Sequence, residues 1–98
     1  MILRVYRVSV PKALHVEFEK EFKAVAKTIL TDYEGLINIE IARPSKWKPL
    51  EFMMISRWDS VDRIKKMAGE NWNEPHIPSH MEKYRVAHSL DHYFGIDL

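Results

Sequence analysis

The stretch EFMMISRWDSVDRIKKMAGENW, residues 51–72, joins a strand pattern directly to a helix pattern. The centre of residues 50–58, FMMI, is apolar at consecutive positions, so an extended chain would present apolar side chains on both faces of a sheet. Asp59 or Ser60 can then cap a helix, and Gly69 can end it. We therefore expect a strand that is covered on both faces, followed by a short helix.

The residues before this stretch predict three further elements. Residues 2–10 are rich in β-branched and aromatic side chains and predict a strand. From about 12 to 30, apolar residues recur at steps of three and four, which predicts an amphipathic helix. Residues 36–43, LINIEIAR, alternate in polarity and predict a second strand. Gly35 can adopt the left-handed conformation that a turn before this strand would need.

The residues after the stretch complete the pattern. A polar loop, NWNEPHIPSH (71–80), precedes one or two expected helical turns within 79–85 and a final strand within 86–96. The resulting order, β-α-β-β-α-β, is the ferredoxin-like plan, an α+β fold with an antiparallel sheet. A chain of 98 residues suits a single domain, 1–98.

In this plan the helices cover one face of the sheet, and the other face needs a partner. We expect that open face to carry large side chains from several strands, namely Tyr6, Val8, Met53 or its neighbours, and Leu90 or Tyr93. An exposed apolar surface of this kind marks an interaction site. The economical solution is a two-fold homodimer that packs sheet against sheet.

The composition argues against several classes of partner. The formal net charge is +1, from 15 basic and 14 acidic residues, which gives no electrostatic footprint for nucleic acid or an anionic membrane. The longest uncharged apolar run, FMMI, is far too short to span a bilayer. The absence of cysteine excludes disulfides and thiolate ligands, and it agrees with a cytoplasmic location.

Three passages of the sequence resemble a known family. The passage YEGLINIEIAR, the stretch EFMMISRWDSVDRIKKMAGENW and the late HYF are similar to the antibiotic biosynthesis monooxygenase-like family of dimeric α+β barrel proteins. The family pattern is a strand that ends in Trp (here Trp58), an acidic or Ser cap, a short helix and a variable loop. The resemblance implies a homodimeric barrel with a pocket in each subunit.

The resemblance also implies a range of chemistries: cofactor-independent monooxygenases of quinols and aromatic polyketides, haem-degrading enzymes, and isomerases of small signal molecules. The haem-degrading members carry an Asn on the first strand and a Trp within the second helix. This sequence has no Asn in residues 2–10, and its second helix offers Met67 but no Trp. Of these chemistries, we therefore favour oxidation of a small aromatic compound over haem degradation.

The loop NWNEPHIPSH could be a metal site, a catalytic loop or a lid. His76 and His80 have the i, i+4 spacing of helical metal ligands, but Pro78 lies between them and opposes a helix. We predict a pocket lid without a metal. Ile77 would face inward, whereas Glu74 and both histidines would mostly face solvent. Trp72 also points inward in this prediction, either plugging the end of the barrel or forming a wall on which a flat ligand stacks.

The candidate catalytic residues lie on strands. His92 shares a strand face with His88 if residues 86–94 are regular, and it is the candidate base, donor or ligand anchor, with Tyr93 as the alternative if the register shifts by one. Tyr6 and Asn38 can hold a ligand oxygen or can pair with neighbouring strands. Arg4 and Glu40 have the same two options, and cross-strand pairing is favoured for them. Met53 and Met67 are expected to contact a ligand.

Two functions follow from these residues. The first is a cofactor-independent monooxygenase or related oxidoreductase that acts on a small aromatic or quinol-like compound, with His92 as base and Asn38 or Tyr6 holding the substrate anion. This class rests on the resemblance. The second is a non-catalytic dimeric module that binds a small hydrophobic ligand. The chain has no Gly-rich phosphate cradle and no carboxylate dyad, and we expect no cofactor.

Overall fold

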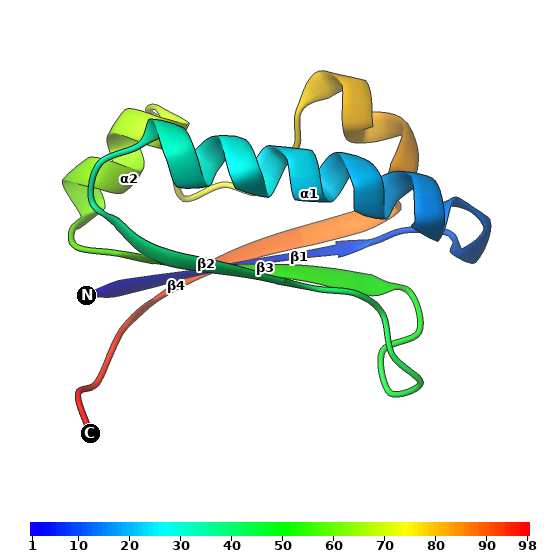
Figure 1. Ribbon diagram of the computed structural model, residues 1–98, viewed down its shortest axis with the longest axis horizontal. Coiled ribbons are helices and arrows are strands. Elements are labelled where there is room, and N and C mark those ends of the chain that lie inside the picture. The colour runs from blue at the N-terminus through cyan, green and yellow to red at the C-terminus, as the bar shows by residue number, and fades with distance from the viewer.

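A computed structural model describes residues 1–98 and confirms the ferredoxin-like α+β order (Figure 1). The strands are β1 (Ile2–Ser9), β2 (Leu36–Ala42), β3 (Glu51–Trp58) and β4 (Ala87–Phe94). The helices are α1 (His15–Asp32) and α2 (Val61–Ala68), and two 3-10 segments, η1 (Lys12–Leu14) and η2 (Ser79–Tyr84), precede α1 and β4. Neither α1 nor α2 combines the length and apolarity that crossing a membrane requires.

The four strands form one antiparallel sheet in the order β2-β3-β1-β4. The central strand β1 pairs with β3 on one side and with β4 on the other, so that Tyr6 stands opposite both Met54 and Leu90. Side chains alternate between the two faces of a strand. This register therefore assigns every residue of the central strands to one face.

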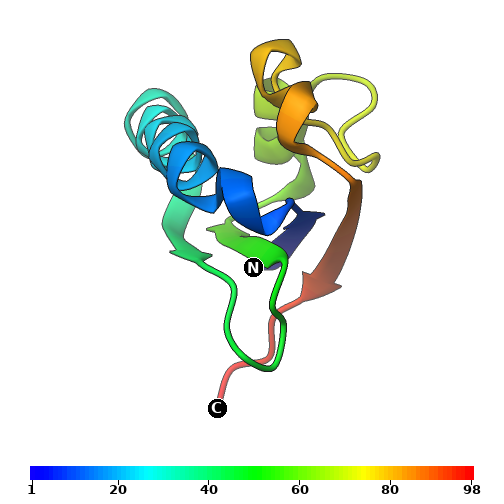
Figure 2. The same ribbon diagram turned by 90° about the vertical axis from the view of Figure 1, so that its right-hand side faces the viewer.

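Both helices lie on the same face of the sheet (Figures 1 and 2). The main core forms where α1 packs on β1 and β3, and its members include Phe18, Phe22, Val8 and Phe52, all of which are buried. A smaller core under α2 contains Trp58, Ile64 and Ile2. The apolar stripe predicted for α1 is thus the surface that contacts the sheet.

The chain turns and caps where the sequence predicts. Gly35 has a φ of 85°, and a Cβ at this position would collide with the side chain of Arg63. Its carbonyl accepts a hydrogen bond from the Asp59 backbone N–H at 2.8 Å, which joins the start of β2 to the end of β3. Ser60 caps α2 by accepting from the Arg63 backbone N–H, and Gly69, with a φ of 82°, ends it.

The residues on the open face of the sheet are not all the predicted ones. Tyr6, Val8 and Leu90 share the helix-facing register, because they stand opposite Met54, Phe52 and Tyr6, respectively. The prediction that Tyr6 and Val8 occupy the open face was wrong, because each lies one residue out of phase with that face. Of the two alternatives given for the last strand, Tyr93 and not Leu90 lies on the open face.

The residues that do occupy the open face include the apolar side chains of Leu3, Val5, Met53, Ile55 and Tyr93. Of these, Val5 is buried by its neighbours on the same face, and Tyr93 is 52% exposed. The β2–β3 loop and the C-terminal tail project on this side of the sheet (Figure 1). They carry further exposed apolar side chains, those of Trp47, Ile96 and Leu98. This surface suits a second copy of the chain.

We predict that Ile55→Glu converts a homodimer into a monomer. Ile55 is half-buried on the open face and faces away from both cores, so a carboxylate there opposes association through the sheet without entering the core. Sedimentation at low micromolar concentration should give twice the chain mass for the native protein and a single chain mass for the variant.

Lys66→Glu provides the matched control, because Lys66 is exposed on α2, on the opposite layer of the molecule. It should leave the dimer intact. A native protein that sediments as a monomer would rule out the sheet-to-sheet homodimer.

Candidate functional site

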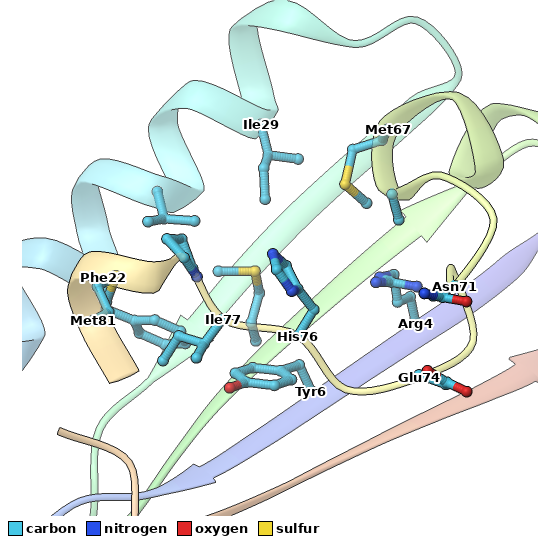
Figure 3. A pocket seen from close by; sticks show the side chains of 14 residues that line it. Arg4, Tyr6, Phe22, Ile29, Met67, Asn71, Glu74, His76, Ile77 and Met81 are labelled. Carbon is cyan, nitrogen blue, oxygen red and sulfur yellow. The ribbon is translucent and has the colours of Figure 1, made fainter. Parts of the chain in front are cut away.

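A cavity of about 260 Å³ lies on the helix-facing side of the sheet, next to the main core. Figure 3 shows Arg4 and Tyr6 rising from β1 at its base, with His76 and Ile77 entering from the chain that crosses above. The lining consists of Arg4, Tyr6, Phe22, Val25, Ile29, Met54, Met67, Ala68, Asn71, Glu74, His76, Ile77, Pro78 and Met81. Its walls are therefore mostly apolar, with a few polar groups on one side, as is usual for ligand sites.

Residues 71–80, hereafter the lid segment, close one side of the cavity. Ile77 is buried in the main core and Pro78 is half-buried beside it, so this part of the lid segment is anchored. Asn71, Glu74 and His76 are exposed and also line the cavity. The structure thus places the segment over the cavity, but Glu74 and His76 contribute to the lining and do not only face solvent.

Arg4 is the charged group of the cavity base. Its Nη1 donates to the carbonyl oxygen of Trp72 at 2.6 Å and lies 2.9 Å from Nε2 of His92. Burial lowers the pKa of Arg4 to about 10, so the guanidinium stays protonated at neutral pH. Because an arginine can only donate hydrogen bonds, Nε2 of His92 must be the acceptor, which places the imidazole proton on Nδ1.

His92 is consequently a supporting residue in this geometry. It does not line the cavity, and its Nε2 lone pair is engaged by Arg4. Burial lowers the pKa of His92, the positive charge of Arg4 lowers it further, and Asp91 opposes the shift. A histidine with a lowered pKa is a weak base. The hydrogen bond that His92 accepts from Arg4 instead holds the Arg4 side chain in place.

Tyr6 and His88 form a second polar pair. The Tyr6 hydroxyl lies 3.0 Å from Nδ1 of His88, and their rings meet edge to face. Burial raises the pKa of Tyr6 above its ordinary value, which keeps the hydroxyl protonated. Burial, and then the charges of Arg85 and His76, lower the pKa of His88. If neutral His88 carries its proton on Nδ1, the Tyr6 hydrogen is free to donate to a ligand.

Several predicted site residues lie elsewhere. Asn38 stands opposite Arg57, accepts a hydrogen bond from its guanidinium at 3.1 Å and belongs to the open face, so it shares no cavity with Tyr6. Met53 also points to the open face, and its neighbour Met54 lines the cavity. The expectation that Asn38 and Met53 belong to the same pocket as Tyr6 was wrong, because both fall on the other phase of the strand alternation.

The predicted aromatic wall has a different contact. The Trp72 ring meets the ring of His92 edge to face, with centroids 4.9 Å apart, and it packs against the smaller core. It does not line the cavity, whereas Met67 and Ile77, the other two predicted ligand contacts, do. Trp72 therefore supports the Arg4–His92 pair in two ways: its ring packs against His92, and its carbonyl oxygen accepts a hydrogen bond from Arg4.

His80 is separate from the cavity. It lies 3.7 Å from Glu21 of α1 and is exposed, as the sequence predicts. The structure contains no group of three His, Asp or Glu side chains close enough to share a metal ion.

Among the lining residues, Met54 and His76 were not predicted as ligand contacts, and Arg4 was considered for ligand binding but was expected to pair across strands. For Arg4 a signal was present: a charged residue in the same phase as Ile2, Tyr6 and Val8 must face the same side as the core of a central strand. No comparable signal identified His76, because its position depends on how a loop without regular structure crosses the sheet.

Known proteins share both the sequence pattern and the fold. Residues 1–73 match the sequence model described as antibiotic biosynthesis monooxygenase. The chain belongs to this family, which confirms the resemblance found in the sequence. No curated protein matches the sequence.

Solved structures share the fold over the whole chain. A Caulobacter crescentus protein that carries the same family description has a TM-score of 0.79 and 19% identity, over 98% of this chain and 90% of its own. The Mycobacterium tuberculosis haem degrader MhuD, with two haems bound in its active site, has a TM-score of 0.73 and 18% identity, over 100% and 99%.

A third structure is a point mutant of the Streptomyces nogalater protein SnoaB, a cofactor-independent oxygenase. It has a TM-score of 0.71 and 14% identity, over 99% of this chain and 94% of its own. At these identities the likeness of all three proteins shows a common fold and does not decide the chemistry.

We predict that His92 makes the stability of the protein sensitive to acid. Its pKa is lower in the folded protein than the ordinary value of 6.5, so the unfolded chain binds the proton more readily. The contribution of neutral His92 to the stability of the fold is complete above pH 6.5, the ordinary pKa of histidine, and is lost as the pH falls below it. Between about pH 7.5 and about pH 5.5, the urea midpoint should fall more for the native protein than for His92→Gln, which keeps an acceptor for Arg4 but does not titrate.

An NMR titration of the histidines tests the cause. The pKa of His92 should lie below 6.5 in the native protein and should rise in Arg4→Gln. His80→Gln, at an exposed site outside the cavity, should leave the acid sensitivity unchanged. A His92 that titrates at or above its ordinary value would contradict the Arg4–His92 geometry.

Proposed function

We propose that the protein is a cofactor-independent oxygenase of a small aromatic, quinol-like compound. The observation that carries this proposal is the cavity of about 260 Å³, with apolar walls and with Arg4 and Tyr6 as donors at its base. Such a site can bind a flat apolar ring and stabilise negative charge on a ring oxygen. Membership of the monooxygenase family gives independent support.

The size of the cavity favours a small substrate. Ligand pockets for drug-sized molecules span ~300–1,000 Å³, and this cavity of about 260 Å³ lies just below that range. It therefore suits a compound of few rings better than a tetrapyrrole. The absence of an Asn from β1 and of a Trp from α2, the two residues that the haem-degrading members carry, likewise argues against haem as the substrate.

The chemistry requires a base, donors and molecular oxygen. For a substrate with an activated ring methylene, removal of a proton gives an enolate that can reduce oxygen. One oxygen atom enters the ring carbon as a ketone and the other leaves as water with the two methylene hydrogens, so atoms and electrons balance. His76 is the histidine that lines the cavity, and we assign it the role of base. Tyr6, held neutral, would donate to the enolate oxygen.

A specific observation favours the alternative, a binding module without catalysis. His92, the candidate base identified from the sequence, has its Nε2 lone pair engaged by Arg4. The oxygenase proposal therefore depends on His76, which is exposed and belongs to the lid segment. If His76 is not a base, the same cavity would bind a small aromatic ligand and leave it unchanged.

We predict that His76→Gln lowers the kcat for oxygen uptake by about 100-fold or more, because general-base catalysis contributes about that much. The assay is an oxygen electrode with a panel of small quinols and anthrones. His80→Gln is the matched control: the same substitution, four residues further along and outside the cavity, should leave kcat unchanged.

Two outcomes would count against the proposal. If no compound of the panel stimulates oxygen uptake while some of them bind, the protein is a binding module. If oxygen uptake occurs but survives His76→Gln undiminished, the reaction has another base.

A further inference from the structure

We infer that Arg4 determines ligand specificity, and that the ligand is an acidic aromatic compound whose ionised oxygens, a carboxylate in the simplest case, bind to the Arg4 guanidinium. This inference rests on the proposed function only in taking the cavity as the functional site. It goes further by naming the charge and the binding group of the ligand.

Arg4 has no acidic partner within the chain. Four of the other five arginines, Arg7, Arg43, Arg57 and Arg63, each pair with a carboxylate, at 3.3, 2.8, 3.1 and 3.0 Å, respectively. The fifth, Arg85, has no ion pair but is exposed to solvent, which Arg4 is not. No carboxylate lies within 4.0 Å of Arg4, and its hydrogen-bond partners, the Trp72 carbonyl and neutral His92, carry no charge. A largely buried cation without a counter-ion is costly, and an anionic ligand would offset that cost.

The free donors of Arg4 are accessible from the cavity. Both of its hydrogen bonds use Nη1, which leaves the N–H groups of Nε and Nη2 without a partner. No side-chain nitrogen or oxygen in the protein is both buried and unpaired, so these two nitrogens are not enclosed. Because Arg4 lines the cavity, its free edge can reach a ligand there. Nε and Nη2 together form the fork that binds a carboxylate through two parallel hydrogen bonds.

The surroundings favour an aromatic anion over a hydrated one. Ile29, Met54 and Met67 supply apolar walls of the same cavity, and a charge pair is stronger in such surroundings than in water. Glu74 is the one carboxylate among the lining residues, and it is exposed. It therefore repels an anionic ligand modestly, but it does not pair with Arg4.

The test compares two ligands of the same shape, 2-naphthoate and its neutral amide 2-naphthamide, by titration calorimetry with the full-length protein. The native protein should bind the acid more tightly than the amide by about tenfold or more, as expected for charge-assisted bidentate pairing. Arg4→Gln should remove this preference while leaving the affinity for the amide nearly unchanged. Arg4→Lys should keep part of the preference, because it retains the charge but not the fork.

Glu74→Gln is the control of opposite sign and should strengthen binding of 2-naphthoate alone. Equal affinities for acid and amide in the native protein would overturn the inference, as would failure to bind 2-naphthoate at millimolar concentration. So would an Arg4→Gln protein that is folded by circular dichroism but keeps the preference, or that loses both ligands equally.

If Arg4→Gln does not fold, the native-protein comparison and Arg4→Lys decide the question without it. The binding measurement also tests Arg4 independently of whether the protein is an oxygenase. Neither naphthalene probe has a hydroxyl group or an activated methylene to oxidise, so calorimetry reports binding whether or not the protein consumes oxygen.

Discussion

The alternation of side chains along β1 determines what the cavity contains. β1 is a central strand, so one of its faces must lie against the helices along its whole length. Val8 completes the main core on that face, but the next two residues in phase, Tyr6 and Arg4, are polar. Apolar packing cannot continue over a phenol and a guanidinium unless these groups find partners. The core therefore gives way to a cavity with a polar base.

The partners of these two groups come from distant parts of the chain. β4 supplies His88 for Tyr6 and His92 for Arg4, the latter at the directly opposed position of the sheet. The Trp72 carbonyl adds a bond across 68 positions of sequence, which ties the start of the lid segment to the sheet. A hydrogen bond to a charged group contributes ~1.5–3 kcal/mol, enough to influence whether a short loop stays closed. A ligand anion on the free edge of Arg4 would thus bind next to the group that holds the lid segment.

The fold was predictable from the sequence because its signals are local and agree with one another. The α1 stripe, the Ser60 cap and the turns at Gly35 and Gly69 all act within a few residues, and the structure contains each of them. The site was less predictable for two physical reasons. The first is that alternation shows which residues of a strand share a face, but not which face points toward the helices. A shift of one residue therefore exchanges Met53 with Met54.

The second reason is that hydrogen-bond partners are set by tertiary contacts. The sequence offered His92 as a base, and only the contact with Arg4 reveals that its lone pair is engaged. The position of His76 likewise follows from the path of a loop with two prolines, which no periodicity describes. The lining residues that the sequence did identify, Met67 and Ile77, are apolar residues in or near regular elements, where pattern and burial coincide.

The central claim is that this cavity, and not the open face of the sheet, is the ligand site, and that Arg4 is its anion-binding group. The most direct test is a crystal structure of the protein with 2-naphthoate. The claim predicts the carboxylate within hydrogen-bond distance of Nε and Nη2 of Arg4 and the rings between Met54, Met67 and Ile29. A naphthalene bound on the open face, or an Arg4 paired with Glu74 beside an empty cavity, would contradict it.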